Sequence, residues 1–488
     1  MKITKLTVFL AILIIFIMAI GTVSAESYDG SICTDENVNA ISTASTYTVN
    51  EDTYSDYFDD NGVLKDSVNE GDNLIIESLS NKDLTINKAI TIDGNNVGTI
   101  NNGSITIGDG STIDGVIIKN LLINDSSKNC IILNSNSLNT LITGNQIYLV
   151  TAGSGWDSYS AIYSMGLVEN TTISNNDIKI TGTAPYSYAI DANGYGIVTG
   201  NPTGFKILDN SISIDVTNYA AGIYLDSPTN SIIDGNDISV SGSTDGCPVY
   251  GISTGDSSLW DSSFSSPKNI TVSNNEISVN GVDSVYGIEL VGGNSFNVSD
   301  NNVIATTDGG AFGIGLGDIS DATILNNDVY VSGVLDKGDC WDSLGTGHAG
   351  ILLQGVSNTE VKDNSIESVY GAGDDVAVLV KKSSNVVVKN NYLISNNTLS
   401  KGNDAVGVDN STEILVENNL PDDSNSTEPI EPKNSTDDKK SSNDMNNKVN
   451  HNDSNKFNSD VNVENTGLPI VVLILALLSI VGLGYKKY

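Results

Sequence analysis

The sequence of 488 residues contains no arginine, so all 23 of its basic residues are lysines. Against them stand 60 Asp and Glu residues, which gives a formal net charge of −37. A protein that binds nucleic acid neutralises phosphates with a patch of basic side chains. The charge balance therefore excludes nucleic acid as a partner, and it suits a protein kept soluble on an exposed surface by its own negative charge.

Cysteine is also scarce, and the four that occur form no CxxC pair. Two interpretations stay open: disulfides in an exported protein, with three connectivities if all four pair, or thiols that pack as small core residues. Leucine is less frequent than isoleucine, valine and threonine together, which favours strands over helices. The cysteines are Cys33, Cys130, Cys247 and Cys340.

The amino-terminal 25 residues have the order of a secretory signal peptide. Lys2 and Lys5 precede an apolar run that begins at Leu6, and small residues follow up to Ala25. This pattern predicts export and cleavage after about Ala25, an uncleaved anchor being the alternative.

The carboxyl-terminal residues 467–488 predict one transmembrane helix. An aliphatic run from Leu468 is followed by Lys486 and Lys487, which places the bulk of the chain outside the cell. Residues 421–466 are rich in Asn, Asp, Ser and Lys, and we expect them to form a disordered polar stalk. Asn425, Asn434 and Asn452 lie in glycosylation sequons within that stalk and are the candidate modification sites.

Between these ends, one asparagine-containing pattern recurs with a minimum spacing of 26 residues, as from Asn275 to Asn301 and again to Asn327. Each copy contains short runs with alternating apolar residues, the period of a strand. No copy can bury its apolar face alone, so the copies must stack. The asparagine is expected to adopt the left-handed conformation at a bend and to bond its counterparts in a ladder.

The predicted fold is therefore all-β: a right-handed parallel β-helix over residues 71–420, preceded by a cap region at 26–70. With the signal peptide at 1–25, the stalk at 421–466 and the anchor at 467–488, this accounts for the whole chain. The β-helix, the export signal and an Asn465–Pro469 turn that opens the hydrophobic anchor resemble the adhesin-like surface proteins of methanogenic archaea. The resemblance implies attachment or a duty in the cell envelope.

Three loops share the tripeptide Trp-Asp-Ser, and they contain all three tryptophans of the chain. An indole face beside a carboxylate suits a sugar ring, although each Trp could equally pin its own loop to the rod. Tyr163 and Tyr224 fall in a row of residues predicted to face outward from a recurrent Gly-Ile strand. Glycines and alanines of that strand, such as Ala161, Ala189 and Gly287, are predicted to lie in the same outward row. The candidate ligand-binding residues are Trp156, Asp157, Trp260, Asp261, Trp341, Asp342, Tyr163 and Tyr224.

The same fold serves polysaccharide lyases and hydrolases, so an enzyme is one alternative function. Glycoside hydrolysis needs two carboxylates roughly 5–9.5 Å apart, but Asp191 and Glu289 of the outward row are expected to lie three coils, or ~14 Å, apart. The sequence thus indicates no catalytic residues and favours a binding protein. A structural spacer of the cell envelope is the other alternative.

No cofactor or metal site is indicated, although acidic loops such as Gly108-Asp109-Gly110 could bind Ca²⁺ weakly. The expected partners are carbohydrate or the surface of another cell, together with the membrane through the anchor. The sequence therefore predicts a cell-surface protein that displays binding loops on a β-helix.

Overall fold

The computed structural model describes residues 44–421, except for residues 109, 126–128, 135, 155–157, 166–167, 194–201, 243–247, 260–264, 334–347, 371–375 and 397–399. These residues belong to the first of two units, Met1–Thr427, the second being Glu428–Tyr488. The expected signal peptide, the anchor and all but the first residue of the stalk lie outside the described residues. Within the described ranges no helix is long and apolar enough to cross a membrane.

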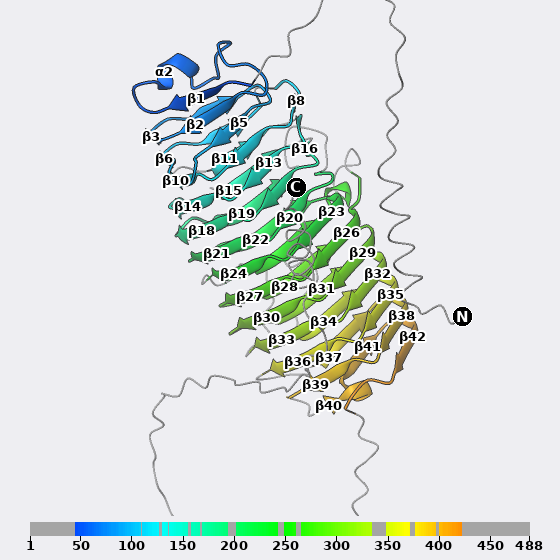
Figure 1. The fold of residues 1–488 in the computed structure, drawn as a ribbon. Coiled ribbons are helices and arrows are strands. Elements are labelled where there is room, and N and C mark those ends of the chain that lie inside the picture. Colours follow the sequence, from blue (N-terminus) through cyan, green and yellow to red (C-terminus); the bar gives the residue numbers. More distant parts are fainter. Residues whose placement is uncertain are drawn as a thin grey trace, which may run out of the picture. The chain divides into compact units, whose positions relative to one another are not determined.

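Three long sheets of parallel strands make up a right-handed parallel β-helix, as predicted (Figure 1). In a typical coil the chain passes through one strand of each sheet and then rises to the next coil. The sheets hold 14, 13 and 12 strands, and a small sheet holds three. We name the long sheets by these strand numbers.

The 14-stranded sheet contains, in spatial order, β1 (Thr46–Val49), β2 (Asn73–Ile76), β5 (Thr91–Asp93), β9 (Ile117–Lys119), β13 (Leu141–Thr143), β17 (Thr172–Ser174), β20 (Lys206–Leu208), β23 (Thr229–Asp234), β26 (Lys268–Ser273), β29 (Asn294–Ser299), β32 (Ser320–Leu325), β35 (Ser357–Lys362), β38 (Ser384–Lys389) and β42 (Thr412–Glu417).

The 13-stranded sheet contains β3 (Ser78–Ser80), β6 (Thr99–Asn101), β10 (Leu122–Asp125), β14 (Gln146–Thr151), β18 (Asp177–Gly182), β21 (Ser211–Val216), β24 (Asp237–Gly242), β27 (Glu276–Gly281), β30 (Asn302–Thr307), β33 (Asp328–Gly333), β36 (Ser365–Tyr370), β39 (Tyr392–Ser395) and β40 (Ser400–Lys401), of which β40 alone is antiparallel to its neighbour.

The 12-stranded sheet contains β4 (Leu84–Ile86), β7 (Ile105–Ile107), β11 (Asn129–Leu133), β15 (Ser158–Met165), β19 (Tyr186–Asn193), β22 (Tyr219–Asp226), β25 (Val249–Gly255), β28 (Val285–Val291), β31 (Ala311–Gly317), β34 (Ala349–Gln354), β37 (Val376–Lys381) and β41 (Val406–Asp409). The small sheet contains β8 (Ile113–Asp114), β12 (Ser137–Leu138) and β16 (Val168–Glu169). Short helical turns are α2 (Tyr54–Tyr57), η1 (Ser257–Leu259) and η2 (Gly402–Ala405).

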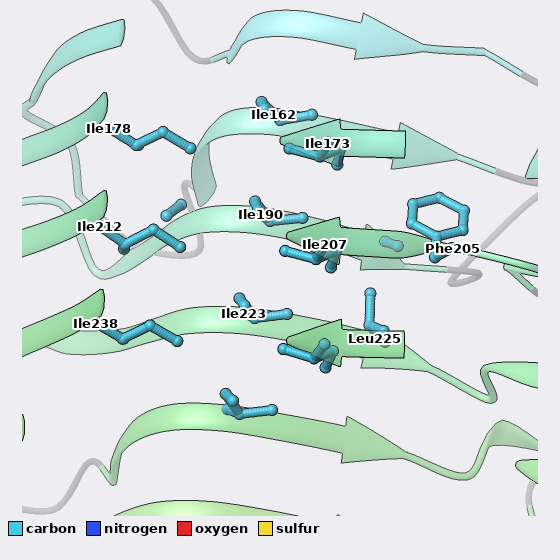
Figure 2. Packing of buried hydrophobic residues seen from close by; sticks show 14 of the residues in the cluster. Ile162, Ile173, Ile178, Ile190, Phe205, Ile207, Ile212, Ile223, Leu225 and Ile238 are labelled. Carbon is cyan, nitrogen blue, oxygen red and sulfur yellow. The ribbon is translucent and has the colours of Figure 1, made fainter. Parts of the chain in front are cut away.

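The core consists of columns of identical or similar aliphatic side chains that stack from coil to coil (Figure 2). Ile162, Ile190 and Ile223 occupy one register position in β15, β19 and β22. Branched side chains fit this arrangement because each packs against its copy in the neighbouring strand on the pleated surface. A single unit cannot bury its apolar face alone, so the apolar alternation in the sequence leads to the stacking of units.

A ladder of buried asparagines runs along the turn between the 14-stranded and the 13-stranded sheets, and this confirms the predicted stacking. In each step the side-chain Nδ2 donates to the Oδ1 of the next asparagine at 2.8–3.0 Å. The last step ends on Asn403 of η2. The ladder comprises Asn145, Asn176, Asn210, Asn236, Asn275, Asn301, Asn327, Asn364, Asn391 and Asn419.

The predicted conformation of these asparagines was wrong by one residue. The left-handed backbone belongs to the residue immediately before each ladder asparagine, for example Asn175 (φ 54°), Asp209 (φ 53°) and Gly235 (φ 69°). Asn, Asp and Gly are the residues that tolerate this region at least cost. The bend is therefore made by one residue, and the following asparagine turns its side chain inward to the ladder.

The prediction that Gly and Ala of the Gly-Ile strand face outward was also wrong. Ala161 and Ala189 belong to the core cluster, and a Cβ atom on Gly287 would lie 2.2 Å from the core methyl Cγ1 of Val303. In the pairing of β25 with β28, Tyr250 lies opposite Tyr286 and Ile252 opposite Ile288. The glycine or alanine between them points inward beside the isoleucine, so strict alternation fails at this position. Gly222, Gly251 and Gly313 were assigned outward by the same alternation, and their added Cβ atoms would likewise meet core methyl groups. Gly315 pairs with Glu289 and lies in the outward row, as predicted.

Candidate functional site

The outward row of the 12-stranded sheet contains polar residues in a fixed register. Pairing places Tyr163 beside Asp191, then Tyr224, Ser253 and Glu289 in successive strands. Asp191 and Glu289 are therefore three coils apart, as the sequence indicates. This row forms the floor of the candidate site.

Beside this floor, a row of aromatic rings follows the same strands. Tyr219 lies 5.7 Å from Tyr250, Tyr250 stacks on Tyr286 at 5.2 Å, and Tyr286 stacks on Phe312 at 5.1 Å between ring centroids. These rings form a second apolar cluster on the outer side of the sheet. Aromatic contacts of this geometry stabilise by about 0.5–1.5 kcal/mol each beyond burial, so the row is a rigid wall.

A pocket of about 310 Å³ opens between the floor and the aromatic row. Its aromatic members come from β22 and β25, and its acidic members from β22, β28 and the residue after β25. One rim is η1, whose Leu259 is 61% exposed. We call it the acid–tyrosine pocket; it is lined by Tyr219, Tyr224, Asp226, Pro248, Tyr250, Ser253, Thr254, Gly255, Asp256, Ser257, Leu259, Glu289 and Val291.

Hydrogen bonds from serines fix the pocket carboxylates of Glu289 and Asp226. The hydroxyl of Ser253 donates to Oε2 of Glu289 at 3.0 Å across neighbouring strands. Asp226 accepts from the hydroxyl of Ser257 and, at 3.2 Å, from the backbone N–H of Ser257. The Ser227 hydroxyl lies 3.3 Å from Asp226 Oδ1 as a further donor. Both carboxylates are therefore held in place before any ligand arrives.

The third carboxylate, Asp256, sits where η1 begins. Its Oδ1 accepts from the backbone N–H of Ser258 at 3.0 Å, which ties the turn to the strand end. A Cβ atom on Gly292 would lie 2.1 Å from Asp256 Oδ2, so this side chain packs closely over a glycine with φ 75°. A residue with a side chain at position 292 would displace the carboxylate.

Burial changes the acidity of the groups around the floor. Removal from water raises the pKa of Asp226, against the opposing effect of its serine donors. Burial likewise raises the pKa of Tyr219, reinforced by Glu289, and that of Tyr224, reinforced by Asp226. These tyrosines therefore remain neutral and can both donate and accept hydrogen bonds at physiological pH.

Asp191 neighbours the pocket without lining it. Burial raises the pKa of this carboxyl to about 7, partly opposed by the Ser160 hydroxyl, which donates to Oδ2 at 3.2 Å. It is 2% exposed, and its Oδ1 has no hydrogen-bond partner among the described residues. Because Asp191 is not part of the pocket lining, it is not placed to contact a ligand there.

The structure brings together only part of the predicted site. Tyr224 lines the pocket, whereas Tyr163 lies in the same row two coils away and does not. The expected residues Trp156, Asp157, Trp260, Asp261, Trp341 and Asp342 lie outside the described residues, as do Asn425, Asn434 and Asn452. Of the Gly108–Gly110 loop, Asp109 is likewise outside them.

Sequence reasoning missed Asp226, Asp256, Tyr219 and Tyr250. The strand register pairs Asp226 with Gly255, the last residue of β25. Asp256 is the next residue in the chain and lies just beyond the end of that strand. The signal that could have found them is an acidic residue at the end of two consecutive Gly-Ile strands. An insertion of variable length between the repeats hides that alignment.

A family model described as periplasmic copper-binding protein (NosD) matches residues 169–397, which is less than half of the chain. The match includes the whole acid–tyrosine pocket. No curated protein matches this chain.

Several solved structures are similar at low identity. The Dettilon tailspike protein covers 69% of this chain at 13% identity with a TM-score of 0.35, and the chain spans 62% of its length. PfbA, a surface adhesin of Streptococcus pneumoniae, covers 71% at 12% identity with a TM-score of 0.31, and 82% of its own length is matched. For the periplasmic alginate epimerase AlgG the shares are 76% and 84%, at 11% identity and a TM-score of 0.33. Similarity at this level does not extend to function.

The described residues do not fit a copper site. Soft and imidazole ligands from Cys, Met and His hold copper in proteins, and the chain has only two His and four Met. Within the described ranges no group of three or more His, Cys, Asp or Glu could hold a metal ion.

Proposed function

We propose that this protein is an adhesin-like component of the cell surface that binds carbohydrate in the acid–tyrosine pocket. The observation that carries the proposal is the pocket itself, in which Tyr219, Tyr224 and Tyr250 face the same space as Asp226 and Glu289. Sugar rings bind where an aromatic face meets their C–H groups and where fixed acceptors meet their hydroxyls.

Several features support the proposal. The acceptors are held by hydrogen bonds from Ser253 and Ser257 before a ligand arrives, which reduces the entropy lost on binding. Leu259 on the exposed rim directly precedes Trp260, so one of the three Trp-Asp-Ser loops continues from the pocket edge. We propose that this loop, and those at Trp156 and Trp341, extend the binding surface.

The proposed location is the outside of the cell, where the anchor at 467–488 and a glycosylated stalk hold the β-helix. The signal-peptide pattern and the match to a family described as periplasmic support export. A membership among the adhesin-like proteins of methanogenic archaea is part of the same proposal. Partner cells would be held through their surface glycans.

A polysaccharide-cleaving enzyme is the second candidate, and one observation favours it. Three carboxylates line a single pocket, and burial raises the pKa of Asp226, as glycosidases require of a general acid. A binding protein retains its ligand intact, whereas an enzyme releases shortened chains. The two functions therefore differ in one readout.

The experiment is a glycan array probed with the full-length chain in detergent, followed by analysis of the captured glycans for cleavage. We expect binding without shortening, and we expect Tyr219→Ala to weaken it by at least about tenfold because it removes one ring of the pocket. Tyr330→Ala is the matched control, since Tyr330 is an exposed tyrosine in β33 of the 13-stranded sheet and does not line the pocket.

Each outcome has a distinct meaning. Equal glycan binding by the wild type and by Tyr219→Ala would show that glycans bind outside the acid–tyrosine pocket. Shortened glycans would establish the enzyme instead. An array on which the wild type binds nothing would contradict carbohydrate binding and leave the spacer function.

A further inference from the structure

The acid–tyrosine pocket is strongly acidic. Among the described residues, its lining includes Asp226, Asp256 and Glu289 and no lysine. These three side chains are 2%, 7% and 4% exposed, so water reaches them poorly. Enclosing like charges together in a space of low dielectric constant is costly, and a positively charged ligand group would offset that cost.

The aromatic lining favours the same class of ligand. A cation over the face of Tyr is attracted by the negative ring surface, and the attraction grows where water is excluded. Tyr219, Tyr224 and Tyr250 supply three such rings around the carboxylates. Negatively charged sugars such as uronates would instead meet acceptors that cannot donate a hydrogen bond when ionised.

The size and remaining chemistry of the pocket suit one sugar unit. A volume of about 310 Å³ is at the lower end of small-molecule sites. Ser253 and Thr254 supply hydroxyl groups, while Leu259 and Val291 supply apolar walls. An ammonium group is a positively charged donor of hydrogen bonds, so an acidic lining favours it over a neutral hydroxyl or an acetamide.

We propose that the acid–tyrosine pocket selects glycan units that carry a protonated amine, that is, amino sugars without the N-acetyl group. The inference rests on the proposed carbohydrate-binding function and names its ligand class. The ammonium group lies among Asp226, Asp256 and Glu289, and the ring lies against the tyrosines.

Calorimetric titration of the full-length chain tests this with β-1,4-linked tetramers of glucosamine, N-acetylglucosamine and glucose at mildly acidic pH, where the amine is protonated. These ligands differ only in the group at carbon 2. The glucosamine tetramer is expected to bind at least about tenfold more tightly than the other two, because only it gains charge-assisted hydrogen bonds. A higher salt concentration should reduce that preference.

The double variant Asp226→Asn, Glu289→Gln keeps the shape of the pocket and removes two charges. It is expected to lose the preference for glucosamine, because its affinity for the glucosamine tetramer should fall at least about tenfold more than its affinity for the glucose tetramer. A purely structural role would weaken the two equally. Asp237→Asn, an exposed carboxylate in β24 on another sheet, is the matched control and should keep the preference.

The outcomes separate this inference from the proposed function. Equal affinity for the three tetramers, selective binding of amine-free glycans on the array, or a preference that survives in the double variant would overturn the inference alone. Absence of binding to any tetramer and to the whole array would overturn the carbohydrate function, and this inference with it.

Discussion

Gly255 makes room for Tyr224, because a Cβ atom on Gly255 would lie 2.7 Å from the Tyr224 hydroxyl oxygen and 3.2 Å from Oδ1 of Asp226. Both neighbours line the acid–tyrosine pocket. The close approach concerns the free ends of side chains, which can move, and Gly255 does not have the left-handed backbone that would forbid a side chain. A larger residue at position 255 should therefore alter the pocket more than the fold.

Gly255→Val is expected to lower glycan affinity by at least about tenfold while costing less than about 2 kcal/mol of unfolding free energy. The valine occupies pocket volume and pushes the Tyr224 hydroxyl aside. Titration with the best glycan and thermal unfolding measure the two effects. Gly255→Ala should lie between wild type and Gly255→Val, and unchanged affinity in the valine variant would contradict the site.

Asn275→Ala should destabilise the protein by about 2–4 kcal/mol, because it removes four buried hydrogen bonds. Its Oδ1 accepts from the backbone N–H and Nδ2 of Asn236, and its Nδ2 donates to Asn301 Oδ1 and Ile233 O. Urea denaturation followed by circular dichroism measures the change.

The matched control for the ladder is Asn280→Ala. Asn280 is exposed at the outer face of β27 and makes one side-chain bond, to Thr306 Oγ1 at 3.2 Å. We expect a change of less than about 0.5 kcal/mol there. Similar losses for the two variants would mean that the ladder adds little beyond an exposed asparagine.

Gly287→Ala should cost about 1–3 kcal/mol through overpacking. The new Cβ would lie 2.2 Å from Val303 Cγ1 and 2.6 Å from the carbonyl oxygen of Gly313. Val303→Ala removes the first of these contacts, so the double variant should be less destabilised than the sum of the single variants. Strict additivity in urea denaturation would show that position 287 does not point into the core.

Much of this architecture could be predicted from the sequence, and the reason lies in its short-range pattern. The ladder asparagines up to Asn391 could be aligned because the apolar residue of the following strand comes two positions later in each copy, as in Asn236-Asp237-Ile238. The left-handed residue could not be assigned in pairs such as Asn326-Asn327, where either asparagine tolerates that conformation.

The pocket could be predicted only in part because it depends on which residues of neighbouring strands lie side by side. Insertions of variable length between those strands hide that pairing. Asp191, Tyr224 and Glu289 were assigned to one row by counting within strands. Asp226 and Asp256 line one pocket only because the chain re-enters the same sheet after residues 227–255. No short-range sequence period predicts where that next strand begins. The inward position of Gly287 was missed because strict alternation does not reveal where two neighbouring residues face the same side.

Asp191→Asn should stabilise the protein relative to wild type more at pH 8 than at pH 4. Because burial raises the pKa of this carboxyl to about 7 from 3.8, the folded state binds more protons between these values. The stability contributed by the protonated form is present below about pH 4 and lost as the pH rises through 7, by up to about 4 kcal/mol. The asparagine variant, which does not titrate, avoids that loss.

This pH dependence must be measured as a difference between variant and wild type at each pH. Burial lowers the pKa of His348 to about 4, so the unfolded state binds more protons there and stability falls as the pH drops from 6.5 to 4. The two groups oppose each other over much of the same range in the wild type. A difference between Asp191→Asn and wild type that stays constant from pH 4 to pH 8 would contradict the raised pKa.

The most direct test of the central claim is a crystal structure of the protein grown with the glycan that binds best on the array. The account predicts electron density for one sugar unit in the acid–tyrosine pocket, with its ring against Tyr219 or Tyr250 and a polar group near Glu289. Density for the glycan elsewhere on the molecule, with the pocket holding only water, would contradict it.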